Sequence, residues 1–352
     1  MPTTRRNDPR ELFDAARDGG TAALARLLTL IERGGVPGRE VSTLAYRAGP
    51  PAYTVGLTGS PGAGKSTLTD RLIALARHGV PGGDGGSTDG AGDDAGPGGG
   101  DGPASPVGVL AIDPSSPFTG GAILGDRVRM QSQALEEGVF IRSMATRGQL
   151  GGLAVAVPDA VRVLSAAGFP VVLIETVGVG QQEVEVASAT DTTVVVVNPG
   201  WGDAIQANKA GLMEIGDVFV INKADRAGTR ETHRDLDLML DLTELGAWRP
   251  PIVETVATTG QGVDEAWEAV GRHRDHLIGH GLLGELRRQR LEREFRQILV
   301  GRVEERVREL EGTALLDGLV AGLADGSVDP YEAADRLLGS IAAPDPDDPD
   351  AP

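Results

Sequence analysis

The sequence predicts an α/β protein in which a mostly parallel β-sheet is covered by helices on both faces. Between residues 53 and 252, short apolar runs alternate with stretches whose apolar residues recur at helical spacing. The runs are rich in Val and Ile and contain few polar residues, as is typical of strands buried on both faces. They lie at 53–57, 107–112, 171–174, 192–197 and 218–221.

The composition limits the class of protein. The chain has 352 residues, 40% of them hydrophobic, which is enough for two ordinary domains or one large α/β domain with helical additions. Its 33 basic and 51 acidic residues give a net charge of −18, which argues against nucleic acid or an anionic membrane as a main partner. The absence of cysteine excludes disulfides and thiolate chemistry. Since the start is polar and no apolar run approaches membrane-spanning length, we expect a cytoplasmic protein.

Four parts are expected along the chain. Residues 1–50 form a helical arm, in which one helix covers about 11–33 and a Pro-containing loop follows. The α/β domain occupies 51–262 and is interrupted at 79–106 by a segment of mostly Gly, Asp, Ser, Pro and Ala, which predicts a disordered insertion. Residues 263–342 are helical, and residues 343–352 form an acidic, Pro-rich tail that is expected to be disordered.

The helical region from 263 carries an apolar stripe on one long amphipathic helix. Its residues are Leu291, Phe295, Ile298, Leu299, Val303, Val307 and Leu310. Packing against the main domain and a dimer interface are the two interpretations.

A glycine-rich loop after the first strand predicts a phosphate-binding site. The loop Gly59-Ser-Pro-Gly-Ala-Gly-Lys65-Ser66 fits the pattern G-x-x-x-x-G-K-[ST] and precedes a helix. Its glycines allow backbone N–H groups to face phosphate oxygens, Lys65 can reach the β- and γ-phosphates, and Ser66 can bind Mg²⁺. Only three of the 33 basic residues are lysines, which argues against a chance match. The expected nucleotide contacts here are Gly59, Gly62, Ala63, Gly64, Lys65, Ser66 and Thr67.

A second motif predicts which nucleotide binds. Asn222-Lys223-Ala224-Asp225 follows the strand at 218–221, at the end of the sheet where open α/β proteins bind ligands. The carboxylate of Asp225 can accept from N1–H and the 2-amino group of guanine, whereas adenine offers neither donor. Lys223 would lie over the base, Asn222 would brace the loop, and the backbone N–H of Ala257 could face guanine O6. GTP is therefore expected in preference to ATP.

Carboxylates that follow two other strands are candidates for a magnesium site. Glu175 ends one buried strand, and Gly178 after it could donate its N–H to the γ-phosphate. Asp113 ends another strand and Asp126 follows a glycine-rich stretch, although both could instead be capping or turn residues. No Gln follows Gly178 directly, so the residue that orients the hydrolytic water is not assigned.

Two further features receive no assigned chemistry. Trp201 lies in a glycine-rich loop that leads to Lys209, where a mobile contact segment and a packed turn are equal alternatives. His273, His276 and His280 recur at helical spacing, and in their charged neighbourhood a solvated helix face is expected rather than a metal site.

Three longer motifs resemble those of the MeaB/ArgK family of P-loop GTPases. They are Glu175-Thr-Val-Gly-Val-Gly-Gln-Gln-Glu183, Asp113-Pro-Ser-Ser-Pro-Phe-Thr-Gly-Gly121 with Gly125-Asp-Arg-Val-Arg-Met130, and Gly202-Asp-Ala-Ile-Gln-Ala-Asn-Lys-Ala-Gly211. The resemblance extends from the N-terminal helix to about Leu338. It implies a P-loop NTPase fold of the SIMIBI type, with an N-terminal helical arm and a C-terminal helical dimerisation extension.

The resemblance also implies a function. Such proteins are GTPase chaperones of adenosylcobalamin-dependent acyl-CoA mutases, most often methylmalonyl-CoA mutase, in which GTP binding and hydrolysis gate cofactor loading and protect the mutase. A homodimer and a partner-sensing switch at 200–209 are implied as well. The implied catalytic residues are Lys65, Glu175 and Asp113, and the implied magnesium ligands are Ser66, Asp113, Asp126 and Glu175.

Two other functions compete with this interpretation. A kinase would transfer the γ-phosphate to a small molecule or protein, although no acceptor-binding module is evident in the sequence. Insertion of a metal centre is the third alternative, for which a chain without cysteine offers little support.

Overall fold

The computed structural model describes residues 8–82, 104–114, 136–146, 152–176, 188–200, 209–243 and 246–342. Most of the predicted insertion at 79–106, the tail at 343–352 and the segment at 201–208 lie outside the described residues. By compactness the chain forms two units, Met1–Leu291 and Glu292–Pro352.

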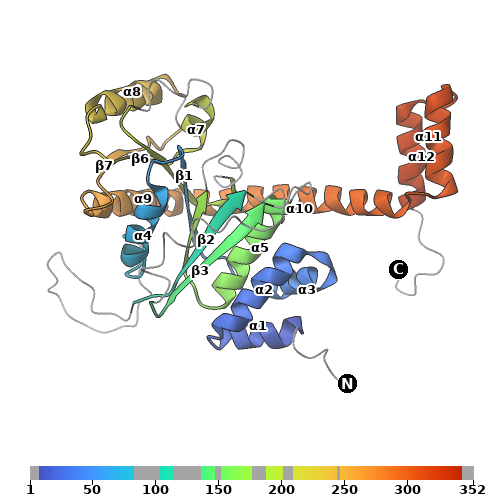
Figure 1. The fold of residues 1–352 in the computed structure, drawn as a ribbon, viewed down its shortest axis with the longest axis horizontal. Helices are drawn as coiled ribbons and strands as arrows, with labels where there is room; N and C mark the ends of the chain where they lie inside the picture. Colours follow the sequence, from blue (N-terminus) through green and yellow to red (C-terminus); the bar gives the residue numbers. More distant parts are fainter. Residues whose placement is uncertain are drawn as a thin grey trace. The chain divides into compact units, whose positions relative to one another are not determined.

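A seven-stranded parallel sheet is the centre of the first unit (Figure 1). The strand order is β3-β2-β4-β1-β5-β6-β7, so the direction of chain progression reverses beside β1. Ligands bind at such a reversal in open α/β sheets, outside the carboxyl ends of the strands. The predicted fold class is confirmed. The strands are β1 Tyr53–Gly59, β2 Val107–Pro114, β3 Val139–Thr146, β4 Val171–Thr176, β5 Thr192–Val197, β6 Val218–Asn222 and β7 Ile252–Thr255.

Helices cover the two faces of the sheet (Figure 1). One face packs against α4 and α9, and the other against the N-terminal arm and α5. In the first unit the helices are α1 Pro9–Arg17, α2 Thr21–Arg33, α3 Gly35–Arg47, α4 Lys65–Ala76, α5 Gly152–Ala166, α7 Lys209–Ile215, α8 Thr229–Leu242 and α9 Val263–Gly279.

The N-terminal arm differs from the prediction in two respects. The single helix expected at about 11–33 is two helices, α1 and α2, and the expected loop after Gly34 is a third helix, α3. Pro37 lies in the first turn of α3, where a backbone N–H has no partner inside the helix. Val41 and Ala45 of α3 are buried in the core of the arm, so tertiary packing stabilises a segment of poor helix propensity.

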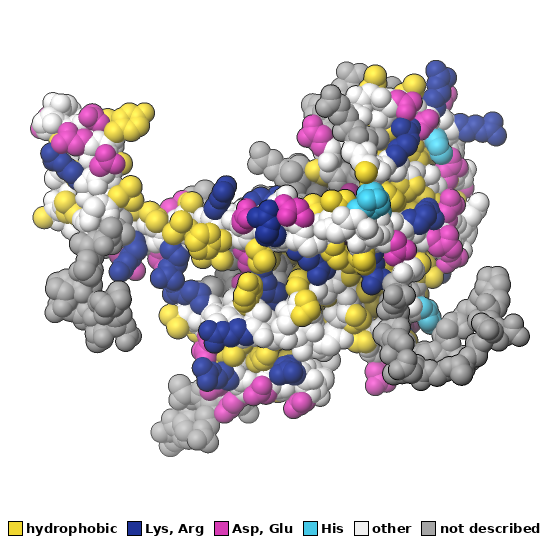
Figure 2. Space-filling view, turned by 180° about the vertical axis from the view of Figure 1, so that it is seen from behind, with side chains coloured by type: hydrophobic (Ala, Val, Ile, Leu, Met, Phe, Trp, Pro, Cys, Tyr) yellow, Lys and Arg dark blue, Asp and Glu magenta, His cyan; other side chains and the backbone are white. Residues whose placement is uncertain are grey.

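The second unit contains most of α10 and two shorter helices, and α10 begins in the first unit. The helices are α10 Leu282–Glu309, α11 Ala314–Asp325 and α12 Pro330–Ala342. Apolar side chains are exposed along this part of the chain among charged ones (Figure 2). None of the described helices has the length and apolarity that crossing a bilayer requires.

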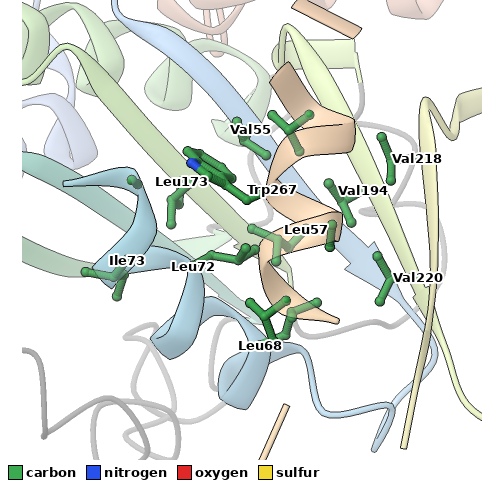
Figure 3. Close-up of a cluster of buried hydrophobic side chains, with 14 of the residues drawn as sticks. Val55, Leu57, Leu68, Leu72, Ile73, Leu173, Val194, Val218, Val220 and Trp267 are labelled. Atoms are coloured by element: carbon green, nitrogen blue, oxygen red, sulfur yellow. The ribbon is translucent and has the colours of Figure 1, made fainter. Parts of the chain in front are cut away.

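The hydrophobic core follows from the alternation of side chains along the strands. In β4, Val171 and Leu173 face the core beneath α4 and α9, whereas Val172 and Ile174 face the arm and α5. Trp267 of α9 fills the first of these cores, together with Leu57, Leu68 and Leu72 (Figure 3). The sheet is therefore buried on both sides, which fixes the carboxyl ends of its central strands in one place.

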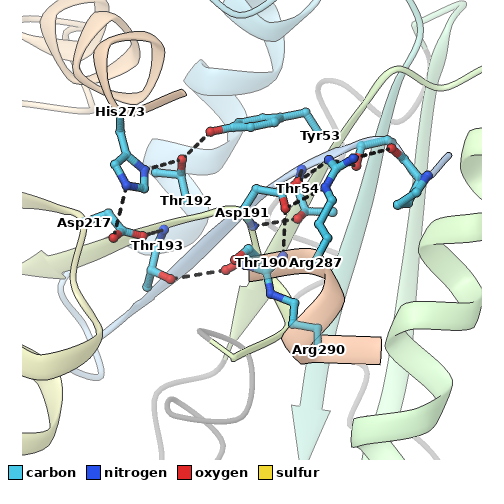
Figure 4. Close-up of polar contacts among 12 residues, drawn as sticks. Tyr53, Thr54, Thr190, Asp191, Thr192, Thr193, Asp217, His273, Arg287 and Arg290 are labelled. Carbon is cyan, nitrogen blue, oxygen red and sulfur yellow. Dashed lines mark hydrogen bonds and ion pairs between the residues drawn. The ribbon is translucent and has the colours of Figure 1, made fainter. Parts of the chain in front are cut away.

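A buried polar network lies at the other end of the sheet, where β1, β5 and β6 begin (Figure 4). Asp191 accepts from the backbone N–H of Thr54 and from the side chains of Arg287 and Arg290, at 3.0, 2.7 and 2.7 Å. Because both arginines come from the first turns of α10, this carboxylate attaches α10 to the sheet.

His273 is also part of this network, so the expected solvated face is wrong for this residue. Its side chain is 4% exposed, Nδ1 lies 2.9 Å from Thr192 Oγ1, and Nε2 lies 3.4 Å from Asp217 Oδ1. Burial, followed by the nearby His276, lowers the pKa of His273 from 6.5 to about 4. The described residues contain no group of three or more His, Asp or Glu side chains that could hold a metal ion.

Replacing His273 with Gln is expected to remove one of two opposing contributions to the pH dependence of stability between pH 6.5 and 4, because burial raises the pKa of the neighbouring Asp217 to about 7 and that carboxyl favours the folded state as the pH falls. A histidine whose pKa is depressed by folding contributes stability above pH 6.5, and this is lost as the pH falls through the folded pKa. The shift corresponds to about 3 kcal/mol. Melting temperatures of the wild type and His273→Gln across this range test the expectation, with exposed His233→Gln as control. Parallel curves for the wild type and His273→Gln would contradict it.

Candidate functional site

The phosphate loop joins β1 to α4 at the point where the sheet order reverses. Gly59 and Gly64 have φ of +123° and +91°, which side-chain-bearing residues rarely adopt. A Cβ at Gly59 would lie 2.0 Å from the carbonyl oxygen of Val196, and one at Gly64 would lie 2.4 Å from Nδ2 of Asn222. Glycine is therefore required at both positions by the backbone and by close neighbours.

Lys65 is held against the start of this loop. Its Nζ donates to the carbonyl oxygens of Gly59 and Ser60 at 2.7 and 3.1 Å, and the residue is buried. As the first residue of α4, it is at the positive end of the helix dipole. The loop, the helix terminus and the ammonium together form an arrangement suited to phosphate oxygens.

Ser66 and Glu175 come together from α4 and β4. Ser66 Oγ donates to Glu175 Oε1 at 2.6 Å. The pairing of β1 with β4 places Leu57 opposite Glu175, so the carboxylate lies beside the phosphate loop. A hydroxyl and a carboxylate are hard oxygen donors of the kind that bind Mg²⁺, which is usually held by one or two protein groups together with substrate phosphates. These residues fit a magnesium ion.

The other residues predicted for the metal and the γ-phosphate are only partly placed. The backbone of Asp113 lies in β2, next to β4, but its side chain is outside the described residues. Asp126 and Gly178 also lie outside them, as does Trp201. Thr67 lies in the first turn of α4, directly after Ser66.

Asn222 joins three parts of the site. It is the last residue of β6 and is buried, and its Nδ2 donates to the carbonyl oxygen of Ala63 at 2.8 Å. Its Oδ1 accepts from Thr255 Oγ1 at 3.2 Å and from the Ala257 N–H at 3.1 Å. The Asn222 amide therefore connects the phosphate loop to the loop that follows β7.

Lys223 and Asp225 follow in the same turn. Lys223 is the one non-glycine residue with positive φ, +62°, within the described ranges, and its Nζ donates to the carbonyl oxygen of Gly62 at 2.6 Å. Asp225 is exposed. The turn thus presents a carboxylate to solvent beside a lysine stem that extends to the phosphate loop.

The structure bears on the predicted role of Ala257 in one respect. Its N–H, expected to face guanine O6, donates to Asn222 in the structure. A contact with O6 would therefore require this N–H to be shared or released by Asn222.

Sequence reasoning missed Arg71, which lies on the exposed side of α4. Its Nε donates to the carbonyl oxygen of Ala257 at 3.2 Å, and its Nη2 donates to that of Thr258 at 2.9 Å. Nothing in the local sequence around Arg71 indicates these contacts, because its partners follow 186 and 187 residues later in the chain, after β7.

The chain is similar in sequence to known proteins. The family model described as "Methylmalonyl Co-A mutase-associated GTPase MeaB" matches residues 24–81 and 103–312. A protein of Pyrococcus abyssi is 46% identical over 336 residues, which cover 94% of this chain and 96% of that protein. The GTPase ArgK of Escherichia coli is 34% identical over 287 residues, 78% of each chain.

Two further similarities are more distant. The mouse protein "Methylmalonic aciduria type A homolog, mitochondrial" is 30% identical over 296 residues, which cover 77% of this chain and 64% of the mouse protein. A crystal structure of a LAO/AO transport system kinase covers 97% of this chain and 99% of its own, with a TM-score of 0.62 and 23% identity. The latter similarity concerns the fold alone.

Proposed function

The chain belongs to the MeaB family of GTPases, and on this premise we propose that it is a GTP-dependent chaperone of an adenosylcobalamin-dependent acyl-CoA mutase. Methylmalonyl-CoA mutase is the first candidate, since the family model bears its name and the mouse relative is named for methylmalonic aciduria. GTP binding and hydrolysis would gate cofactor loading and protect the mutase. A cytoplasmic location is part of the proposal.

The observation that carries the nucleotide part of the proposal is the link between the two motifs. Asn222 and Lys223 both donate to carbonyl oxygens of the phosphate loop, at 2.8 and 2.6 Å. A nucleotide with its phosphates on the loop would therefore have its base near the turn that contains Asp225. In this arrangement Asp225 would recognise guanine, and Ala257 would contribute its N–H at O6.

Magnesium is part of the proposed site. When bound, the ion would neutralise charge on the β- and γ-phosphates. Ser66 and Glu175 would hold it, with Asp113 and Asp126 as the further proposed ligands. Lys65 would contact the β- and γ-phosphates, and Gly178 would donate to the γ-phosphate.

Replacing Asp225 with Ala is expected to remove the preference for GTP over ATP. The ratio of the dissociation constant of ATP to that of GTP should fall by at least about a hundredfold. The carboxylate is the group that can accept from both guanine donors, and its exposure means that the fold does not depend on it. Calorimetric titrations of GTP and ATP in the presence of Mg²⁺ measure the ratio. Exposed Asp264→Ala, on α9, is the control. Retained guanine selectivity in Asp225→Ala would refute the assignment.

The mutase part of the proposal has its own test. GTP labelled at the γ-phosphate is incubated with the protein, with and without methylmalonyl-CoA mutase. Release of labelled phosphate to water, accelerated by the mutase, is the expected result. Label transferred to an acceptor would overturn the proposal in favour of a kinase, and an unchanged rate with mutase would reject this partner.

A homodimer through the C-terminal helices is also proposed. Part of the apolar stripe on α10 is exposed, with Phe295 at 65% and Leu299 at 51%. Phe295→Asp is expected to convert the dimer to a monomer, because a charge in an apolar interface would lose its hydration. Light scattering after size-exclusion chromatography measures the mass. Leu242→Asp on α8, also at an exposed apolar position, is the control and should leave the mass unchanged. A monomeric wild type would reject the dimer.

A further inference from the structure

The short loop after β7 is internally closed. The backbone N–H of Val256 donates to the carbonyl oxygen of Gln261 at 2.9 Å, and the N–H of Gly260 donates back to Val256 at 3.0 Å. Val256 and Gln261 form an isolated antiparallel bridge. The loop therefore has a defined shape of its own, and what remains to be fixed is its position relative to the phosphate loop.

Two side chains fix that position by holding the two sides of one residue, Ala257. Asn222 accepts from the N–H of Ala257, and Arg71 donates to its carbonyl oxygen and to that of Thr258. Ala257 itself is buried. Because a peptide unit is planar, holding successive carbonyl oxygens sets the orientation of the peptide planes on either side of Thr258.

The place of Arg71 connects this loop directly to the phosphate site. Arg71 is on α4, the helix that begins at Lys65, so it is less than about two turns from the predicted phosphate contacts. Its guanidinium is a rigid planar fork that can donate to two acceptors at once, which an ammonium group does not reproduce. Asn222 joins the same loop to the carbonyl oxygen of Ala63. The loop after β7 is thus attached to the phosphate loop through Asn222 and to α4 through Arg71.

We propose that Arg71 is a positioning residue for guanine recognition, which holds the loop at 256–261 so that the Ala257 N–H, which donates to Asn222 in the structure, can be shared with O6 of the base. This inference rests on the proposed function, in which Ala257 is the O6 donor. Without Arg71, the loop would still be closed by its own bridge, attached through Asn222 and held by the hydrogen bond from the Thr259 N–H to the carbonyl oxygen of Val256, but the peptide between Ala257 and Thr258 would lose the donor to its carbonyl oxygen. The hydrogen bond from the Ala257 N–H to O6 of the base would then weaken, whereas the contacts of the protein with the phosphates would not change.

The test uses two nucleotides that differ at O6. GTP carries O6, whereas 6-thioguanosine triphosphate carries sulfur, a much weaker acceptor, in its place and keeps the N1–H and the 2-amino group that Asp225 would bind. In the presence of Mg²⁺, Arg71→Ala is expected to lower the affinity for GTP about five- to tenfold, the size of one hydrogen bond. The affinity for the analogue is expected to change less than about twofold. Arg71→Lys should recover only part of the loss, because it restores the charge without the fork.

Arg77→Ala is the matched control. Arg77 directly follows the other end of α4 and donates to Glu136 Oε2 and to the carbonyl oxygen of Glu137, at 2.6 and 2.9 Å. Arg77→Ala therefore removes a similar set of contacts without affecting the loop after β7, and the affinities of this variant for the two nucleotides should stay in the wild-type ratio. Melting temperatures of all variants check that the fold is intact.

The outcomes separate this inference from the proposed function. If the wild type prefers GTP to the analogue and Arg71→Ala binds both nucleotides with wild-type affinity, the role of Arg71 is wrong while the guanine site stands. Equal losses for both nucleotides in Arg71→Ala would also overturn it, because they would indicate a structural effect on the phosphate site. If the wild type itself shows no preference for O6, the Ala257 assignment fails, and the inference fails with it.

Discussion

Replacing Lys65 with Met is expected to lower the rate of GTP hydrolysis at saturating GTP by about a hundred- to a thousandfold. This range is typical of removing one preorganised group that stabilises charge in the transition state. The structure holds the Lys65 ammonium at the loop between β1 and α4, 2.7 Å from the Gly59 carbonyl oxygen. Methionine keeps much of the length of the stem and removes the charge. Release of phosphate in the presence of Mg²⁺ is the measurement.

Lys223→Met provides the contrast within the same site. Lys223 also reaches the phosphate loop, through the carbonyl oxygen of Gly62, but it comes from the turn proposed to contact the base. Its loss is expected to raise KM and to leave kcat within about threefold, since binding the base stabilises ground state and transition state alike. If Lys65→Met hydrolysed GTP within about tenfold of the wild type, with an unchanged melting temperature, the assignment of Lys65 would be wrong.

The parts of the fold that were predictable are those with local signals. The phosphate loop, the buried strands and the turn at Asn222 each depend on neighbouring residues, and the strands β1, β2, β4, β5 and β6 lie where their apolar runs are. The strand β3 was not predicted, because Arg142 and Ser143 interrupt its apolar run. It lies at the edge of the sheet and pairs with β2 alone among the described strands, so it does not need to be apolar throughout.

The unpredicted parts depend on contacts between distant residues. The helix α3 contains Gly35, Pro37 and Gly38 in its first turn, and its local propensity is therefore low. It is stabilised by packing of Val41 and Ala45, which the sequence around them does not specify. In the same way, His273 is buried because Trp248 and Thr192 lie against it, and both come from other parts of the chain.

The site shows the same division between local and distant signals. Lys65, Ser66 and Asn222 belong to short motifs and could be named from the sequence. The hydrogen bond between Ser66 and Glu175 depends on β4 lying beside β1, and this order of strands is a property of the whole sheet. No motif contains Arg71, whose role emerges only when α4 and the loop after β7 are placed together.

Replacing Asp191 with Ala is expected to lower the free energy of unfolding of the first unit by about 3–5 kcal/mol, the cost of breaking a buried ion pair by removing one partner. The Asp191 side chain is 2% exposed. Burial alone would raise its pKa, but the hydrogen bond and charge of Arg287, with the charge of Arg290, lower it below 3.8. A carboxylate with a depressed pKa contributes stability above its unfolded pKa and loses it as the pH falls through the folded value.

Tryptophan fluorescence during chemical unfolding measures this effect, because all three tryptophans of the chain lie in the first unit. Asp241→Ala is the control: its carboxylate also pairs with an arginine, Arg249, at 2.8 Å, but both side chains are exposed. Such a pair contributes less than about 1 kcal/mol. Arg287→Met provides a milder break of the same cluster should Asp191→Ala not fold.

The comparison of these variants distinguishes burial from pairing. Both carboxylates have arginine partners at similar distances, so a difference between them would come from the desolvation of Asp191 and from the arginines left without it. Because Arg287 and Arg290 belong to α10, loss of Asp191 should also expose the start of this helix to proteolysis. Equal stability of Asp191→Ala and Asp241→Ala would mean that the apolar contacts of the sheet hold α10 in place without this cluster.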